Sequence, residues 1–291
     1  MPSQPRTPSI SYPQHLSTLP PTTATLLLSF PTPQTLLVTI NRPEQMNCLN
    51  GKAHHEMERV WDWYDREGGL RCAVVTGARP KGKGRRAFCA GQDLKEWFTN
   101  QDSAEPQLKH PPGGFGGLSR RTGKKPIIAA VDGLCMGGGF EMICNIDLTI
   151  CTPSSIFSFP ELSVGVIPIA GALPRLVYNI GLARASELVL TGRVLSANDA
   201  YEWGIANKVT SEREDVVEEA VKMAQKVCDM SPDGVIVARR GLRMAWGGLG
   251  VEAATKDVTG MWEELERGVN IKEGLRAFME KRKPRWFDSK L

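Results

Sequence analysis

The sequence lacks any run of about 18 consecutive apolar residues, the length that a membrane-spanning helix needs; runs such as 36–40 have only the length of a strand. A membrane span is therefore excluded. The formal net charge is only +4 over 291 residues, which is too small to require a nucleic-acid partner. Hydrophobic residues make up 41% and charged residues 23% of the chain, which excludes disordered and fibrous proteins. The length accommodates one large core, alone or with a small satellite domain.

Metal-binding and disulfide patterns are also missing. The seven cysteines are an odd number and include no Cys-x-x-Cys pair, a pattern typical of reduced thiols in an intracellular compartment. The four histidines, His15, His54, His55 and His110, have no metal-ligand spacing. His54 and His55 are predicted to lie on a surface helix. We therefore assign no metal site, no cofactor and no histidine-based catalysis.

Phosphate-binding motifs are incomplete. Residues 77–84 resemble a P-loop, but Gly84 stands where that loop needs Ser or Thr, and residues 85–91 do not open a helix. No Gly-x-Gly-x-x-Gly is present either. Nucleotide hydrolysis and dinucleotide binding therefore lose their main support. The basic loop residues are interpreted as solvent-exposed, with a contact to a ligand phosphate as the alternative: Lys81, Lys83, Arg85 and Arg86.

The remaining sequence predicts an α/β protein. Short apolar segments predict strands at 26–30, 35–40, 72–76 and 127–131, and apolar residues at helical spacing predict a helix over 52–67. Strands that alternate with helices indicate a layered core. The polar and Gly/Pro-rich stretch 99–125 is long for a loop, which indicates a segment that is either mobile or functional.

The chain divides into four parts. Residues 1–24 are rich in Pro, Ser, Thr and Gln and match neither a secretory nor a mitochondrial leader, so they predict a disordered tail. Residues 25–209 form the predicted catalytic core. Residues 210–287 have a helical pattern and are predicted to form a C-terminal oligomerisation region, and 288–291 are a short tail.

Two glycine-containing turns attract attention. Residues 137–139 are three glycines between a predicted strand and a short helix, and residues 87–94 form a second small-residue turn after another strand. Glycines allow the backbone to approach a ligand closely. Two amides from separate turns are a common way to build an oxyanion hole for acyl chemistry. A glycine turn that only packs a strand against a helix is the alternative.

Two glutamates lie next to apolar sequence. Glu141 follows the three glycines, and Glu161 follows Pro160 at the end of an apolar strand. An unpaired buried charge is costly, so each glutamate is either partnered, in a cap or salt bridge, or functional. Together they are able to act as an acid/base pair on one water molecule.

Taken in order, these motifs resemble the enoyl-CoA hydratase/isomerase (crotonase) family over about residues 26–287. The matching segments are 40–43 (Ile-Asn-Arg-Pro), 87–94 (Ala-Phe-Cys-Ala-Gly-Gln-Asp-Leu), 125–133, 137–141 (Gly-Gly-Gly-Phe-Glu), 159–168, 190–193, 200–207 and 273–282.

The resemblance implies a crotonase-like spiral of ββα units with a C-terminal helical trimerisation region, assembled as a homotrimer or hexamer. It also implies a coenzyme A thioester as substrate, with no metal or separate cofactor. By the family match, the two oxyanion-hole amides are those of Gln92 and Gly138. They would stabilise negative charge on the thioester oxygen.

The same resemblance assigns the acid and base. Hydratases of the family keep both glutamates, so Glu141 is expected to activate the water that adds at C3, and Glu161 to exchange a proton at C2. Lys95 matches a position near the bound coenzyme. Lys281 matches a position that reaches toward the coenzyme phosphates, often across a subunit boundary.

One position departs from the family pattern. Typical hydratases have glycine where this chain has Ile169, beside the second glutamate. That position lines the acyl pocket in the family, so a larger side chain is expected to reshape the pocket. A specialised or branched acyl group is consistent with this change.

The tripeptide Ser289-Lys290-Leu291 matches a peroxisomal address that an import receptor reads. The expected function is therefore a peroxisomal 2-enoyl-CoA hydratase that works by paired-glutamate catalysis. An isomerase that shifts a double bond through one glutamate is the alternative on the same fold. A non-catalytic acyl-CoA- or RNA-binding oligomer is the alternative of another class, for which the basic residues at 120–121 and 124–125 are the sequence feature.

Overall fold

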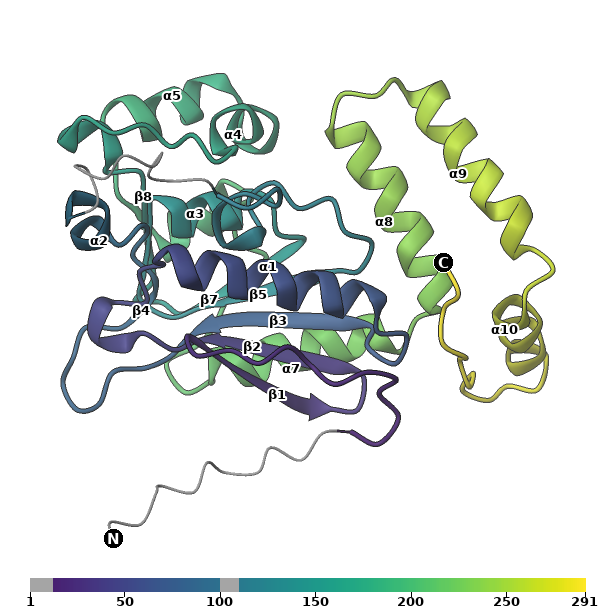
Figure 1. Cartoon of the computed structure of the whole chain (residues 1–291). Coiled ribbons are helices and arrows are strands. Elements are labelled where there is room, and N and C mark those ends of the chain that lie inside the picture. Colours follow the sequence, from purple (N-terminus) through teal and green to yellow (C-terminus); the bar gives the residue numbers. More distant parts are fainter. Residues whose placement is uncertain (1–12, 100–109) are drawn as a thin grey trace, which may run out of the picture.

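The computed structural model describes residues 13–99 and 110–291, which form two β-sheets surrounded by helices (Figure 1). The larger sheet has six strands, in the order β1 (Leu26–Thr32), β2 (Thr35–Ile40), β3 (Cys72–Gly77), β5 (Ile127–Val131), β7 (Leu148–Cys151) and β10 (Lys208–Val209). The smaller sheet has four, in the order β4 (Ala87–Cys89), β6 (Leu134–Met136), β8 (Ile156–Ser158) and β9 (Leu195–Ser196).

From β3 to β8, successive strands of the chain alternate between the two sheets. β3, β5 and β7 lie side by side and parallel in the larger sheet, and each is followed by β4, β6 or β8 in the smaller one. The chain therefore winds as a spiral whose turns add one strand to each sheet, which confirms the predicted ββα spiral. Because equivalent strands are in parallel register, the turns that follow β4 and β6 leave the smaller sheet at the same edge.

The larger sheet is covered on both faces. Along β3, Ala73 and Val75 join the main core, while Cys72 and Val74 point to the opposite face and pack with α7 (Val216–Cys228). A strand buried on both faces reads as a continuous apolar run, which is why 72–76 was recognisable in the sequence. Because α7 packs against this sheet, it belongs to the core. The boundary expected near residue 210 therefore falls after α7 in the structure.

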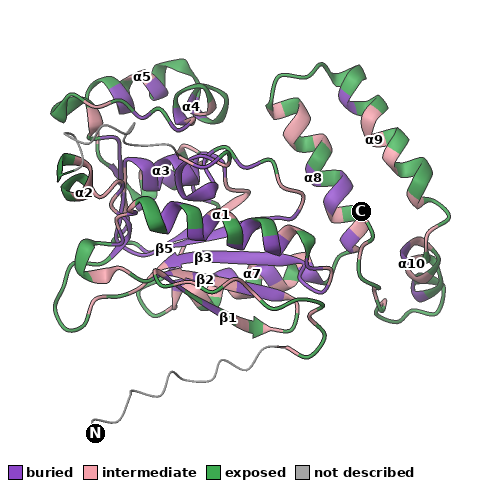
Figure 2. Cartoon of the chain, in the orientation of Figure 1, coloured by how far each residue is buried: buried purple, intermediate pink, exposed green. Residues whose placement is uncertain are grey.

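Three helices follow α7 and stand beside the core: α8 (Pro232–Trp246), α9 (Val251–Leu265) and α10 (Val269–Met279) (Figure 1). α9 and α10 are mostly exposed in the single chain (Figure 2). Their exposed side chains include large apolar ones, such as Val251, Leu275, Phe278 and Met279. This is the kind of surface that oligomers bury; the homotrimer or hexamer stays a prediction.

Helix α1 (Gly51–Arg66) covers the main core at the start of the spiral. The Asn50 side chain caps it by accepting a 2.9 Å hydrogen bond from the amide of Ala53. Its buried stripe contains the predicted Met57, Val60, Trp61 and Tyr64, and also residues that were not expected there: Ala53, His54, Glu56 and Trp63. The expectation of a surface position for His54 was wrong, because His54 is only 2% exposed.

The predicted disordered tail is only partly described. Residues 1–12 lie outside the described residues. Residues 13–24 do not behave as a disordered tail, because Ser17 and Thr18 donate hydrogen bonds to the Glu67 carboxylate and Ala24 donates one to Glu56. Buried carboxylates need such partners, so this segment satisfies the two glutamates at the edge of α1.

The other helices are short: α2 (Leu94–Thr99), α3 (Gly138–Ile143), α4 (Ala172–Ile180), α5 (Leu182–Leu190) and α6 (Ala197–Glu202). All seven cysteines are free. Within the described ranges, none of the helices combines the length and apolar character that crossing a membrane requires.

Candidate active site

A cavity of about 160 Å³ opens between the turn after β4, the start of α3 and the segment around Glu161. Five residues singled out in the sequence line it: Gln92, Gly138, Glu141, Glu161 and Ile169. The structure therefore brings together residues that are up to 77 positions apart, from position 92 to position 169. The rest of the wall is mainly apolar and comprises Ala90, Gly91, Leu94, Trp97, His110, Phe115, Gly137, Pro160, Val164, Val166 and Ile167.

The two glycine-containing turns lie against each other. Gly91 has a φ of +100°, and a Cβ placed on it would lie 3.5 Å from the amide nitrogen of Gly138 and 3.2 Å from the carbonyl oxygen of Met136. Only glycine adopts this conformation readily. Neither the amide of Gln92 nor that of Gly138 is used in a turn, cap or sheet hydrogen bond within the described ranges. Both predicted donors therefore remain available at one cavity.

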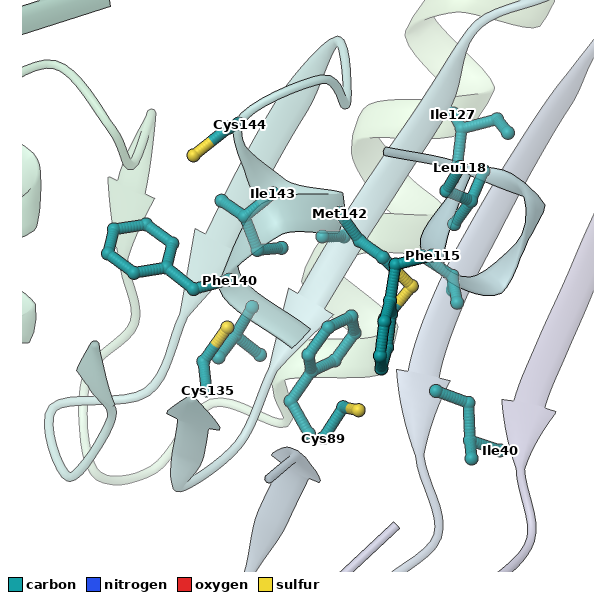
Figure 3. Packing of buried hydrophobic residues seen from close by; sticks show 14 of the residues in the cluster. Ile40, Cys89, Phe115, Leu118, Ile127, Cys135, Phe140, Met142, Ile143 and Cys144 are labelled. Carbon is teal, nitrogen blue, oxygen red and sulfur yellow. The ribbon is translucent and has the colours of Figure 1, made fainter. Parts of the chain in front are cut away.

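Packing also demands the glycines. A Cβ on Gly138 would lie 2.2 Å from Cε2 of Phe115, and one on Gly139 would lie 2.3 Å from the carbonyl oxygen of Cys89. Figure 3 shows Phe115 and Cys89 beside the short helix α3, which carries Phe140, Met142 and Ile143. The packing interpretation of the glycine triplet is thus confirmed, and this packing places the first turn of α3 in the cavity wall. Its role in binding a ligand stays a prediction.

Glu141 lies on α3 and is 3% exposed. The amide of Ala172 donates a 3.1 Å hydrogen bond to its Oε2 atom. Burial raises the pKa of Glu141 to about 7, opposed by this backbone hydrogen bond and reinforced by the charge of Glu161. Its carboxyl group therefore titrates near neutral pH.

Glu161 begins the 3-10 turn η3 (Glu161–Val164) directly after Pro160. A Cβ on Gly137 would lie 2.8 Å from its Oε1 atom, so the carboxyl group lies against the glycine triplet. Its Oε2 atom is buried and has no hydrogen-bond partner in the described part of the chain. Burial raises the pKa of Glu161 to about 7.

The electrostatics favour one shared proton. Two carboxylates in one poorly solvated cavity resist ionising together, so near neutral pH the pair carries about one proton. The amide of Ala172 stabilises the ionised form of Glu141, whereas Glu161 has an unpartnered oxygen. Because the pKa of each group is raised to about 7, both carboxyl groups are partly protonated near neutral pH. A partly ionised pair is able to supply an acid and a base at one site. The roles of Glu141 as base and Glu161 as acid stay predictions.

Several wall residues were not found by sequence reasoning. His110 and Phe115 belong to the long stretch 99–125; residues 100–109 lie outside the described residues, but the part from His110 onward forms one side of the cavity. Trp97 on α2 also lines it. His54 lies behind the wall and contacts Gln92. Its position three residues before Met57 on the helix stripe was the available signal for a buried histidine.

Other predicted residues lie apart from the cavity wall. Lys95 is exposed on α2, between the cavity-lining Leu94 and Trp97. Lys281 is exposed two residues after α10, a helix on the opposite side of the molecule from α2 (Figure 1). Their roles in binding the coenzyme stay predictions.

The tripeptide at 289–291 lies against the core rather than extending away from it. The carbonyl oxygen of Leu291 accepts a hydrogen bond from Lys124 Nζ, and its amide donates a 3.2 Å hydrogen bond to Ser289 Oγ. The Lys290 side chain is exposed. None of the three residues lines the cavity that holds the glutamates.

The model of the family described as enoyl-CoA hydratase/isomerase matches residues 33–289 of this chain. The chain belongs to the enoyl-CoA hydratase/isomerase family. The match spans both sheets, the cavity and the C-terminal helices, so it covers every part of the fold that bears on the site. As its members' description implies, the protein is an enzyme that acts on a coenzyme A thioester.

Similar proteins include the mevalonyl-coenzyme A hydratase SIDH of Beauveria bassiana, which is 45% identical over 94% of this chain and 98% of its own length. The carnitinyl-CoA dehydratase of Proteus mirabilis is 34% identical over 86% of this chain and 94% of its own length. Among solved structures, an enoyl-CoA hydratase of Mycobacterium tuberculosis H37Rv has a TM-score of 0.80 at 30% identity and covers 91% of this chain and 99% of its own. These likenesses confirm the crotonase fold and a hydratase of coenzyme A thioesters.

Proposed function

We propose that this protein catalyses the reversible addition of water to a 2-enoyl-CoA thioester, with Glu141 and Glu161 as the acid/base pair. The observation that carries the proposal is the presence of both carboxyl groups in one cavity, with pKa values raised to about 7, next to two free amides. Such an arrangement provides a base, an acid and an oxyanion hole around one thioester.

In the hydration direction, ionised Glu141 removes a proton from a water molecule while the oxygen of that water molecule forms a bond to C3. The amides of Gln92 and Gly138 stabilise the negative charge that develops on the thioester oxygen. Protonated Glu161 then gives its proton to C2. In dehydration the same groups run in reverse: Glu161 takes the proton from C2, and Glu141 gives one to the hydroxyl group that leaves C3 as water.

The substrate class that we propose is a branched acyl chain with a distal hydroxyl group, as in mevalonyl-CoA. Two mevalonyl-CoA hydratases are 45% and 42% identical to this chain over more than 90% of its length. Dehydration of the mevalonyl group breaks the C2–H and C3–O bonds, forms the C2=C3 bond and leaves the hydroxyl group at C5. Among the described wall residues, His110 and the indole of Trp97 are the polar side chains left to meet such a hydroxyl group, since Gln92 is bound to His54.

The test is a panel of thioesters followed by absorbance, because hydration removes the conjugated enoyl chromophore. We expect turnover of 5-hydroxy-3-methylpent-2-enoyl-CoA with a kcat/KM at least about tenfold above that of straight-chain crotonyl-CoA. Hydration of crotonyl-CoA alone would support the chemistry and contradict the substrate class. Appearance of the chromophore from a 3-enoyl-CoA, without hydration, would show an isomerase. Salt-sensitive RNA binding without turnover would indicate the non-catalytic alternative.

We also propose a peroxisomal homotrimer or hexamer. The tripeptide Ser289-Lys290-Leu291 supports recognition by the peroxisomal import receptor, and the exposed apolar side chains of α9 and α10 support assembly. Imaging of an N-terminally fluorescent-tagged chain with and without the tripeptide tests the address. Light scattering of the purified protein tests the assembly, and a monomer at micromolar concentration would contradict it.

A further inference from the structure

His54 makes two hydrogen bonds that join separate parts of the cavity wall. Its Nδ1 atom accepts a 3.0 Å hydrogen bond from the amide of Gly116, and its Nε2 atom lies 2.9 Å from Oε1 of Gln92. An amide nitrogen can only donate, so Nδ1 carries no proton. Nε2 therefore carries the proton and donates it to Gln92. The contacts themselves determine the tautomer of the ring.

The hydrogen bond from Nε2 of His54 reaches the turn after β4. Gln92 follows Gly91, and its backbone amide is the proposed donor to the thioester oxygen, whereas its side chain is held by His54. A side chain that is anchored at its end restricts the rotation of the peptide that carries it. His54 therefore limits the orientation of one of the two oxyanion-hole amides.

The hydrogen bond to Nδ1 of His54 acts on the amide of Gly138 through packing. Gly116 is held from both sides by α1, because its amide donates to His54 and its carbonyl oxygen accepts a 3.0 Å hydrogen bond from Trp61 Nε1. The preceding residue, Phe115, is 2% exposed, and its ring lies where a Cβ of Gly138 would be. The His54 and Phe115 rings meet edge to face, 4.6 Å apart. The ring of Phe115 therefore restricts the position of Gly138 and of its backbone amide.

We propose that His54 is a positioning residue that aligns the amides of Gln92 and Gly138 on the thioester oxygen. His54 does not line the cavity itself, so it acts through its contacts with Gln92 and Phe115. Burial lowers the pKa of His54 to about 4, so the ring keeps the neutral form that both contacts need at the pH of turnover. This inference rests on the proposed function, because it assumes that the two amides bind a thioester carbonyl.

The experiment uses His54→Phe, which keeps a ring of similar size and removes both hydrogen bonds, and His55→Phe as the matched control on the same helix. His55 is exposed and next in the sequence. We expect kcat on the enoyl-CoA to fall about 10- to 100-fold in H54F with KM within about threefold of wild type. H55F should match wild type in both constants.

A bound chromophore separates positioning from folding. 4-Dimethylaminocinnamoyl-CoA has no turnover to complicate the measurement, and its absorbance moves to longer wavelength when hydrogen bonds polarise its carbonyl. We expect this red shift for wild type and H55F, and most of it lost in H54F at similar affinity. A full red shift in H54F with unchanged kcat would overturn the proposal. So would equal losses of affinity and rate, which indicate a purely structural role.

Gln92→Met provides a second, independent variant, because it keeps the backbone amide and removes only the acceptor for His54. We expect a smaller loss of red shift in Q92M, and little further loss when Q92M is added to H54F, since both remove the same hydrogen bond. Additive losses in the double variant would overturn the proposal.

If H54F does not fold, Q92M decides by itself: an unchanged red shift contradicts the inference. If wild type binds the chromophore with a red shift but hydrates no enoyl-CoA, the proposed function fails while this comparison still stands.

Discussion

The floor of the cavity and its rim are built in different ways. The floor consists of Phe115, which begins the 3-10 turn η2 (Phe115–Gly117), and of Gly138 and Glu141 on α3; all three are buried. The rim consists of Val164, Ile167 and Ile169, which are 63%, 55% and 74% exposed. Their segment starts at the last residue of η3 and contains Gly165 and Gly171 nearby, both with positive φ. Apolar groups surround the site on both sides, but only those of the floor are packed in the free protein.

This difference separates two tasks. Glu141 and the amide of Gly138 lie where close packing restricts movement, which electrostatic catalysis requires, whereas Glu161 and Gln92 are half-buried between the floor and the rim. The rim makes few contacts until an acyl chain covers it, and burying its apolar surface then favours binding. We therefore expect changes in the floor to alter the rate of the chemical step, and changes in the rim to alter the choice of acyl chain.

The largest effect is expected from the two carboxyl groups of the cavity. Glu141→Gln and Glu161→Gln should each lower kcat by about 10²–10⁴, because each removes one proton transfer while keeping the shape. Steady-state hydration followed by absorbance measures this loss. Glu187→Gln, which removes a surface carboxylate paired with Arg193 at 2.7 Å, should keep wild-type activity. Unchanged turnover in either cavity variant would remove that glutamate from the mechanism.

The next effect is expected at Gly138. An alanine there would force Phe115 to move, since the new Cβ would be 2.2 Å from its ring. We expect Gly138→Ala to lower kcat about 10- to 100-fold and to destabilise the protein by about 1–3 kcal/mol. Turnover and urea unfolding measure the two effects. The control is Gly51→Ala at the start of α1, where a Cβ would meet nothing within 4 Å. Equal effects in both variants would contradict the role of packing in the floor.

A smaller effect is expected from pH. Hydration needs Glu141 ionised and Glu161 protonated, and the pKa of each is raised to about 7. The profile of kcat/KM should therefore be bell-shaped around neutral pH, falling about tenfold per pH unit on each limb. The limb at high pH should disappear in Glu161→Gln. A flat profile between pH 5 and 9 would show that the two groups do not share a proton.

The pH dependence of stability has a defined sign. Because burial raises the pKa of Glu161 above its usual value, its stabilising contribution is present at low pH and is lost as the pH rises through about 7. Glu161→Gln should therefore melt at a higher temperature than wild type at pH 8 and at nearly the same temperature at pH 4. The reverse order at pH 8 would mean that an unseen partner stabilises the ionised carboxylate.

The smallest effect is expected at the rim. Ile169→Gly restores the residue of typical hydratases, and we expect it to change the ratio of kcat/KM for branched and straight enoyl-CoA thioesters by about three- to tenfold. The kcat on crotonyl-CoA, which serves as the internal control, should stay within about twofold. A drop in kcat on both substrates would show that Ile169 acts through the floor, and the contrast between the two regions would then fail.

Much of this site was predictable from the sequence, but not all of it. Gln92, Gly138, Glu141 and Glu161 were identified by motif, and the structure brings all four to one cavity. The buried position of His54 was misjudged because histidine as a residue type is mostly not fully buried, although its place on the apolar stripe of the helix indicated burial. His110 lies in a stretch without periodicity, where no local pattern indicates which side chains point inward.

The α/β class, the strands at 26–40, 72–76 and 127–131, and the family membership follow from sequence alone, because apolar periodicity and short motifs are local properties of the chain. The tertiary structure decided that α7 belongs to the core, that residues 13–24 pack on α1, and that His54 joins two walls of the cavity. These contacts link residues far apart in the chain, and their geometry depends on how the whole spiral packs. The raised pKa values of the two glutamates were also decided by the tertiary structure, since burial and mutual proximity exist only in the folded protein.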